Sequence, residues 1–230
     1  FGVAPCSGLR RGVVSDADAT AEAVRASVAE ASAQAGLPIK RAYVGLTGSH
    51  VESENRWRQV PHDAGIRTIT ESDLDAALTI AGGIDVAEGR KLLHAIPRSY
   101  ALDGVHGVRN PLGMHTSQLH IQSHLVTGSI EHMESLKAAV SDAGVAPGAV
   151  VVDSIACADA VIAADEREDG VILLDIGGGT TDLSVFFDGA VVHTSVLPIG
   201  GYQFTNDLRV AFATSYEEAE RLKCQFGTAT

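Results

Sequence analysis

The sequence predicts an α/β fold, and three observations lead to this prediction. Segments with helical periodicity alternate along the chain with short apolar or alternating runs that are typical of strands. The runs at 149–153 and 171–175 are mostly aliphatic, as expected for buried strands. Asp188-Gly189 lies between two apolar runs and strongly predicts a hairpin. With 45% apolar residues among 230, the chain can bury a substantial core.

Helix-end signals locate the helices. Asp16 is a suitable N-cap for a first helix, and Gly36 lies where its C-cap belongs. Thr70, with Asp73 three residues later, predicts a capped second helix over 70–81. Further helices are expected at 129–143, 157–165, 203–213 and 215–226. The inward faces expected of the second and third helices are Leu74, Ala77 and Leu78, and Ile130, Met133, Leu136, Ala139 and Val140.

Apolar and alternating runs predict the strands. They are expected at 41–48, 91–104 with an interruption at Pro97, 118–126, 149–153, 171–175, 182–187 and 190–196. The remaining segments read as connections: a loop at 1–14 that runs into a strand end, an irregular polar stretch at 49–69 with a turn at 61–65, a loop at 107–114, and a charged turn at 165–170.

Composition excludes several classes of function. The formal net charge of −12 argues against nonspecific nucleic-acid binding and against a basic membrane-surface patch. The three cysteines lie far apart without a CxxC pair, which favours a reduced, cytosolic setting. No signal peptide opens the chain, and no apolar run is long enough to span a bilayer. The chain begins with Phe1 and stops just after a helical pattern, so a fragment is expected.

The motif DIGGGTTD at 175–182 joins two predicted strands. Consecutive glycines expose backbone N–H groups in a concavity that binds phosphate, and threonine hydroxyls add donors. Asp175 can hold Mg²⁺, through water, or orient an attacking water. The motif therefore predicts a site for a metal-bound polyphosphate; a glycine-rich turn without a ligand is the alternative. The expected contacts are Gly177, Gly178, Gly179, Thr180, Thr181 and Asp182.

The same turn is neither of two other phosphate loops. It leads into a strand rather than a helix, unlike the dinucleotide-binding fingerprint, and no lysine follows its last glycine, unlike a Walker A loop. Instead, DIGGGTTD resembles the second phosphate loop of the actin, Hsp70 and sugar kinase superfamily. That resemblance implies an actin-like (ribonuclease H-like) ATPase fold, in which two phosphate hairpins grip Mg-ATP across a cleft.

Two later segments extend the resemblance. LPIGGYQFTNDL at 197–208 is similar to the superfamily's next segment, where Gly200 and Gly201 would open a helix beside the nucleotide. AERLKCQFG at 219–227 looks like the helix on the adenosine side, which implies that Glu220 and Lys223 reach the ribose and base. Their spacing places both on one helix face. A surface ion pair is the alternative.

The first half resembles one branch, the bacterial FtsA family. The similar segments are SGLRRGVVSDADATAEAVRASVAEASAQAG, YVGLTGSHVES, LLHAIPRSYALDGVHGVRNPLGM and LHIQSHLVTG. The resemblance implies an inserted 1C (SHS2) subdomain at 40–127 and the remainder of subdomain 1A at 1–39 and 128–165. Residues 166–230 would begin subdomain 2A, carry the second phosphate loop and enter 2B. The first phosphate loop is expected before Phe1.

The resemblance implies an ATP- and Mg²⁺-binding protein with at most weak ATPase activity. Such a protein forms filaments with itself, tethers the FtsZ ring to the inner membrane at the division septum, and recruits later division proteins through 1C. The membrane helix and the FtsZ site would lie beyond Thr230. Two alternatives stay open: a PilM-like actin homologue of type IV pilus assembly, and a small-molecule kinase of the same superfamily.

Four further residues are candidates. Asp153 follows the strand at 149–153, where Hsp70-like members place a catalytic carboxylate; it is a metal or water ligand, or a helix cap. His120 and His124 would share one strand face, which is a poor metal site without a nearby acid or cysteine and is better read as a partly exposed face. Trp57 marks an interface or packs on its own subdomain's helix.

Overall fold

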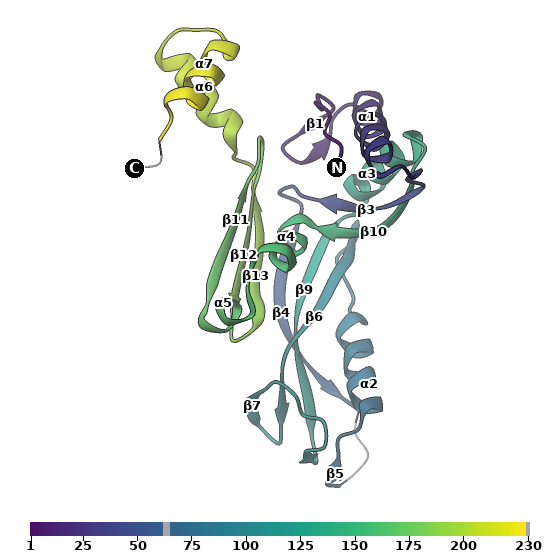
Figure 1. Cartoon of the computed structure of the whole chain (residues 1–230). Coiled ribbons are helices and arrows are strands. Elements are labelled where there is room, and N and C mark those ends of the chain that lie inside the picture. Colours follow the sequence, from purple (N-terminus) through teal and green to yellow (C-terminus); the bar gives the residue numbers. More distant parts are fainter. Residues whose placement is uncertain (62–64, 229–230) are drawn as a thin grey trace.

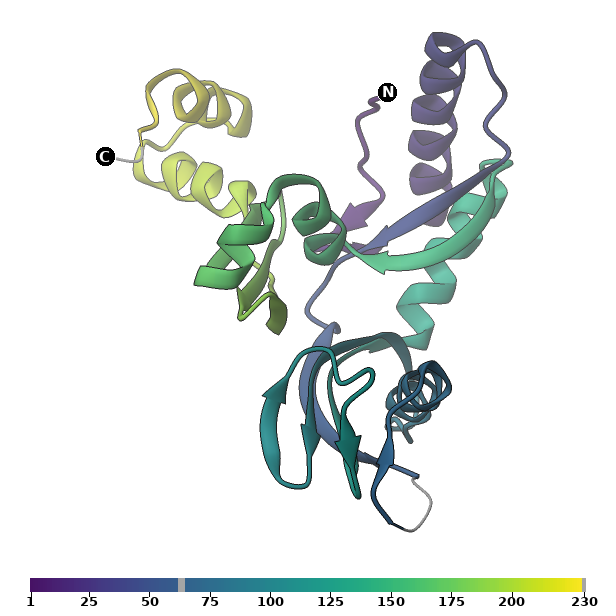
Figure 2. The ribbon, with the colours of Figure 1, turned by 60° about the horizontal axis from the view of Figure 1, so that its bottom comes forward.

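The computed structural model describes residues 1–61 and 65–228, and its strands and helices alternate in the expected α/β manner (Figure 1). One sheet joins β3 (Arg41–Leu46) and β10 (Ala146–Val152) in parallel. Helices α1 (Ala17–Ala35) and α3 (Ile130–Asp142) pack beside this pair (Figure 2). Val44, Val140 and Val145 form the shared core, because β-branched side chains suit a buried parallel pair.

A four-stranded antiparallel sheet lies below this unit in Figure 1. Its order is β4 (Glu52–Val60), β9 (Leu119–Ser129), β6 (Arg90–Leu102) and β7 (Val105–Val108). Helix α2 (Glu71–Gly82) covers one face. Its buried Ala77 and Ala81 meet Leu119 and Ile121, so the core forms where the helix and the central strand face each other.

A third sheet carries the glycine motif. It joins β11 (Val171–Ile176), β12 (Thr181–Phe187) and β13 (Ala190–Leu197) in sequence order, all antiparallel. Helices α4 (Asp153–Val161) and α5 (Ala164–Asp169) pack against it, and α6 (Gly201–Ala211) and α7 (Tyr216–Phe226) follow it. Two short antiparallel pairs complete the architecture: the hairpin of β1 (Leu9–Arg10) and β2 (Val13–Val14), and the pairing of β5 (Arg67–Thr68) with the distant β8 (His115–Thr116).

Hydrogen bonds confirm the predicted helix ends. The Asp16 carboxylate accepts the Ala19 N–H at 3.0 Å, and Gly36 closes α1 with a φ of 66°. At α2, the N–H and hydroxyl of Thr70 donate to Asp73 at 2.8 and 2.7 Å. Arg67 adds an ion pair to the same carboxylate, so this helix start is fixed from two directions.

Several expectations at element level are wrong. The stretch 49–69 contains the nine-residue strand β4, which has no apolar alternation because only Ser53, Arg58 and Val60 are even partly buried. The charged turn at 165–170 is helix α5, whose start is fixed by the Glu166 carboxylate on the Ala163 N–H at 2.9 Å. Leu78 and Ile130 are exposed rather than inward.

Three other segments differ in extent. Strand β6 continues through Pro97 with a shift of register next to it, and β7 occupies the start of the expected loop at 107–114. The helix expected at 157–165 is α4, which begins at Asp153 and ends at Val161. The expected turn at 61–65 includes residues 62–64, which lie outside the described residues. Within the described part, no helix is long and apolar enough to cross a membrane.

A hydrogen-bond network joins β13 to the four-stranded sheet. The Ser53 hydroxyl donates to the Thr194 carbonyl at 2.7 Å and accepts the Thr194 N–H at 3.1 Å. Asn55 donates to the Val192 carbonyl at 2.8 Å. His124 lies between Asn55 Oδ1 at 2.8 Å and Thr194 Oγ1 at 3.0 Å. His124 is fully buried, so the expected partly exposed strand face is wrong at this residue; burial lowers its pKa to about 4.

Candidate functional site

The glycine turn forms the tip of the β11–β12 hairpin. Asp175 and Asp182 are directly opposite each other in the register of the two strands. The Gly177 N–H donates to the Thr180 carbonyl at 2.9 Å and closes the turn. Gly177 and Gly178 are exposed, whereas Thr180 and Asp182 are buried. A Cβ at Gly178 would meet no atom within 4 Å, so the tip has an open side.

Helix α6 is attached to this tip through its first residues. The N–H groups of Gly201 and Tyr202 donate to the carbonyls of Gly177 and Gly178 at 2.8 and 2.7 Å. A Cβ at Gly200 would lie 2.5 Å from the Gly177 oxygen, so the approach requires glycine there. The two glycines that sequence reasoning assigned to the nucleotide therefore position α6 against the turn.

Two loops from the N-terminal part approach the tip from another side. A Cβ at Gly179 would lie 3.3 Å from both the N and the Cα of Arg11, in the β1–β2 turn. Thr47, which follows β3, lies with its hydroxyl 2.7 Å from each carboxylate oxygen of Asp182. A Cβ at Gly12 would be 2.9 Å from Thr47 Cγ2, so these loops also contact each other. Figure 1 shows the hairpin tip between β1 and the α6–α7 pair.

Sequence reasoning missed both Arg11 and Thr47. Each contacts a partner more than 130 residues away, and no local pattern reports such a contact. Each also precedes a glycine, Gly12 or Gly48, in the motifs LRRG and LTG. Those glycines, both at positive φ, are the signal that marks these segments as tight loops.

Three carboxylates share the base of the tip. Burial, followed by the charges of Asp182 and Asp175, raises the pKa of Asp153 to about 6. Burial also raises the pKa of Asp182, with the Thr47 hydroxyl opposing that shift. The Asp153 carboxylate approaches Gly45 so closely that a Cβ there would lie 2.2 Å from Oδ1. The three carboxylates therefore repel one another, and a bound cation would reduce that repulsion.

The alternative reading of Asp153 as a helix cap is wrong. Val152 occupies the N-cap position of α4, and no side-chain hydrogen bond caps that helix. Cys157, one turn further along α4, lies with Sγ 3.5 Å from Asp175 Oδ2. Burial and this carboxylate raise the pKa of the Cys157 thiol, so it stays protonated beside the cluster.

The donor set fits a cation that is held partly by other ligands. Among the described residues, no three His, Cys, Asp or Glu side chains are arranged to hold a metal ion. Mg²⁺ keeps several waters and binds through one or two carboxylates together with substrate phosphates. Asp175 and Asp182 beside an open glycine turn supply such carboxylates. The residues present therefore fit Mg²⁺ carried by a polyphosphate rather than a resident metal.

Glu220 and Lys223 lie on one face of α7, as their spacing predicts. Lys223 Nζ is 2.8 Å from Glu220 Oε2 and 3.0 Å from the hydroxyl of the buried Thr205, which also donates to Glu220. Lys223 reaches back to the Gly201 carbonyl at 3.4 Å. The lysine first, then Thr205, lowers the pKa of Glu220. The pair thus connects α7 to the start of α6, next to the tip.

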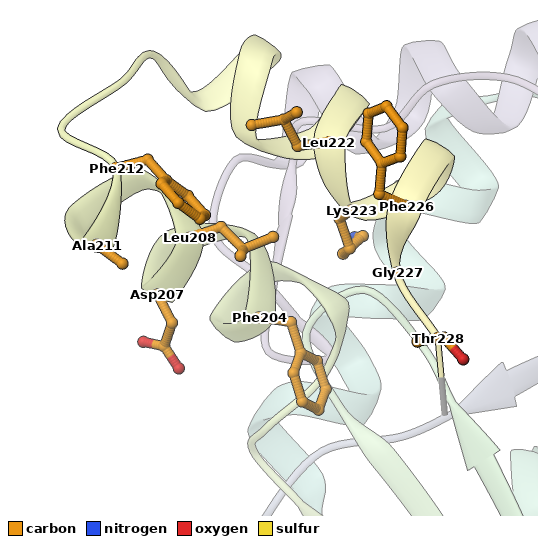
Figure 3. A pocket seen from close by; sticks show the side chains of 10 residues that line it. All are labelled: Phe204, Asp207, Leu208, Ala211, Phe212, Leu222, Lys223, Phe226, Gly227 and Thr228. Carbon is orange, nitrogen blue, oxygen red and sulfur yellow. The ribbon is translucent and has the colours of Figure 1, made fainter. Parts of the chain in front are cut away.

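Lys223 also borders a groove between α6 and α7. The groove has a volume of about 960 Å³, and Figure 3 shows the aromatic side chains of both helices around it. Its lining is mainly apolar: Phe204, Leu208, Ala211, Phe212, Leu222 and Phe226. Trp57 lies on β4, outside this groove. Its ring contacts His106 edge-to-face, with the ring centroids 4.9 Å apart.

Solved structures similar to this fold are actin-like proteins. A PilM–PilN type IV pilus biogenesis complex matches 97% of this chain and 60% of its own chain, with a TM-score of 0.66 and 20% identity. The ethanolamine utilization protein EutJ from Carboxydothermus hydrogenoformans matches 96% and 51%, with a TM-score of 0.52 and 18% identity. At these identities the likeness shows the fold, which is actin-like.

Sequence relatives are more specific. Cell division protein FtsA of Neisseria meningitidis serogroup B is 35% identical over 100% of this chain and 55% of the relative. FtsA of Pseudomonas aeruginosa is 34% identical over 100% and 54%, and FtsA of Escherichia coli K12 is 31% identical over 99% and 54%. The chain thus spans about half the length of these curated relatives.

Two family models match separate parts of the chain. The model of the SHS2 domain inserted in FtsA matches residues 48–127, which hold the four-stranded sheet and α2. The model of cell division protein FtsA matches residues 172–230, which hold the glycine turn and the helices after it. The relatives extend this agreement over the whole chain. Over its whole length the chain is similar to proteins of the FtsA family.

Proposed function

We propose that this protein is an ATP-binding, actin-like cell-division protein that polymerises and tethers the FtsZ ring to the cytoplasmic membrane. Segment 40–127 would act as the 1C subdomain that recruits later division proteins, and neighbouring copies would form the filament. The membrane contact would be a C-terminal amphipathic helix beyond Thr230, at the cytoplasmic face of the division septum. Similarity to the FtsA family supports this proposal, because the relatives that match the whole chain are cell-division proteins.

ATP binding rests on one observation: the open glycine turn lies between a cross-strand pair of carboxylates. Backbone N–H groups and the Thr180 and Thr181 hydroxyls suit phosphate oxygens, and Asp175 and Asp182 suit the cation that accompanies them. When bound, Mg²⁺ neutralises polyphosphate charge. Helix α6 is attached to the turn at Gly177 and Gly178, so the nucleoside end of the nucleotide would extend from the turn toward α6 and α7.

The nucleotide is proposed to act mainly as a conformational ligand. Thr47 follows β3, and Asp182 lies in the β11–β12 hairpin. A ligand at the tip would therefore contact two separate parts of the fold. Asp153 is the group best placed to orient a water molecule or to accept a proton from it, because its raised pKa lies near neutral pH. We expect at most a weak ATPase, with Asp175 as the residue that holds the cation through water.

The two alternatives have less support. The PilM-containing structure is 20% identical and supports the fold alone. A small-molecule kinase would need a substrate-binding acid or base in the first domain, and the sequence suggests no candidate there beyond Asp153. The FtsA relatives, at 31–35% identity, favour cell division.

The test is a calorimetric titration of Mg-ATP into the full-length protein and three variants. Asp175→Ala removes charge for the cation, and Gly178→Val fills the open side of the tip without a clash. Asp159→Ala is the matched control, since it removes an exposed carboxylate of α4 that pairs with Arg167. We expect Asp175→Ala and Gly178→Val to abolish binding and the control to keep it. Binding that survives both changes would contradict the assignment of the tip to ATP.

A further inference from the structure

The β1–β2 hairpin has an arginine where the backbone disfavours one. Arg11 and Gly12, the two central residues of the turn, have φ values of 51° and 80°. Turns with positive φ at both positions prefer Asn-Gly, because a Cβ is strained in the left-handed region and Asn offsets this strain through local hydrogen bonds of its short polar side chain. An asparagine would therefore be more stable at this position than the arginine that the chain carries. Such local strain is commonly kept at functional sites.

The backbone of Arg11 also lies against the glycine turn, and its cationic side chain has no anionic partner among the described residues. Its backbone N and Cα each lie 3.3 Å from the position of a Gly179 Cβ. The residue is exposed, and it forms no salt bridge within the described part of the chain. Three carboxylates belong to the same tip, yet none of them pairs with it. An exposed guanidinium beside a polyphosphate site can make paired, charge-assisted hydrogen bonds to phosphate.

The turn has two distinguishable ends. Helix α6 binds the carbonyls of Gly177 and Gly178, and Lys223 lies beside the start of that helix. Arg11 contacts the other end, at Gly179. If the nucleoside lies on the side of α6 and α7, the phosphate chain runs along the turn from Gly177 toward Gly179. The last phosphate is then the one nearest to Arg11.

We propose that Arg11 binds the terminal phosphate of the nucleotide held by the 177–180 turn, so that the β1–β2 hairpin distinguishes a nucleoside triphosphate from a diphosphate. This inference rests on the proposed function, because it takes the turn to be a nucleotide site. It adds a residue, from a different part of the chain, that responds to the state of the nucleotide. Thr47 lies next to Gly12 of the same hairpin and hydrogen-bonds to Asp182, so the hairpin is connected to the acidic side of the site as well.

The variant Arg11→Asn separates this role from folding. Asparagine suits the turn better than arginine, so we expect an unchanged or higher melting temperature. In the full-length protein with Mg²⁺, we expect the affinity for ATP to fall at least about tenfold, as for loss of a charge-assisted contact, and the affinity for ADP to change less than about twofold. Arg11→Lys should recover part of the difference, since it keeps the charge without the fork.

Arg10→Asn is the matched control, because Arg10 is the neighbouring exposed arginine in β1 and does not contact Gly179. It should leave both affinities unchanged. Equal loss of ATP and ADP binding in Arg11→Asn, or no loss at all, would overturn the role of Arg11 while Asp175→Ala still tests the site itself. If the unmodified protein binds neither nucleotide, the proposed function and this inference are both overturned.

Discussion

Replacing Asp153 with asparagine should stabilise the protein, and should do so only where the carboxyl is charged. Burial and the charges of Asp182 and Asp175 raise the pKa of Asp153 from 3.8 to about 6. The folded state therefore holds this proton more tightly than the unfolded chain, which makes the charged form a cost to folding. The cost is absent below the unfolded pKa, increases as the pH rises, and is complete above the folded pKa. The uncharged amide of the Asp153→Asn variant would have no such cost.

The magnitude follows from the two pKa values. Each tenfold change in a protonation equilibrium corresponds to about 1.4 kcal/mol, so the full cost is about 3 kcal/mol. At pH 5 about half of it is present, and at pH 7.5 nearly all. We expect Asp153→Asn to raise the free energy of unfolding by about 1.5 kcal/mol at pH 5 and about 3 kcal/mol at pH 7.5. Urea unfolding followed by circular dichroism at both pH values measures this difference.

The control is Asp159→Asn, on the same helix. Its side chain is 75% exposed and pairs with Arg167 at 2.9 Å. An exposed ion pair contributes about 0–1 kcal/mol, so this change should be small and the same at both pH values. A lower stability of Asp153→Asn, or a gain that does not increase with pH, would refute the description of the tip as a mutually repelling acid cluster.

Two further predictions concern the elements that hold the site and the four-stranded sheet. Asp73→Ala removes the cap of α2 and the ion pair with Arg67, and should lower the free energy of unfolding by about 2–3 kcal/mol. Because the Arg67 hydrogen bond strongly lowers the pKa of Asp73, this contribution is complete above the unfolded pKa near 4 and is lost as the pH falls through the lower folded pKa, which urea unfolding at pH 7 and about pH 2 would reveal. Gly200→Ala should separate α6 from the turn, since its Cβ would lie 2.5 Å from the Gly177 oxygen, whereas Gly178→Ala should fold normally. Amide exchange at Tyr202 reports the difference, and equal protection in both variants would contradict it.

The elements that sequence reasoning located are those with a local signal. The caps at Asp16 and Thr70 are side chains adjacent in sequence to the groups that they bind. The β12–β13 hairpin follows from Asp188-Gly189, where Asp188 has the positive φ that the turn requires. The acid–glycine–acid motif likewise places Asp175 and Asp182 opposite each other by strand register alone.

The parts that were not predicted depend on distant contacts or on solvent. Arg11 and Thr47 join the site through loops far away in sequence, which only the assembled fold brings together. Helix α5 has six residues, none of them buried, so it has no apolar stripe to recognise. The pair of Glu220 and Lys223 was placed correctly on one face, but the sequence did not show that Thr205 holds both.

The polar composition of β4, because of which the sequence pattern did not predict this strand, has a consequence for self-association. In the described part of the chain, β4 is an outer strand of its sheet, with β9 on one side and no strand of that sheet on the other. A nine-residue strand at the edge of a sheet is a template for aggregation. Two acids and then two bases occupy every second position of β4, and they oppose this, because a docking strand would have to strip water from them: Glu52, Glu54, Arg56 and Arg58. The charges of β4 therefore disfavour edge-to-edge pairing at this strand as a route to self-association.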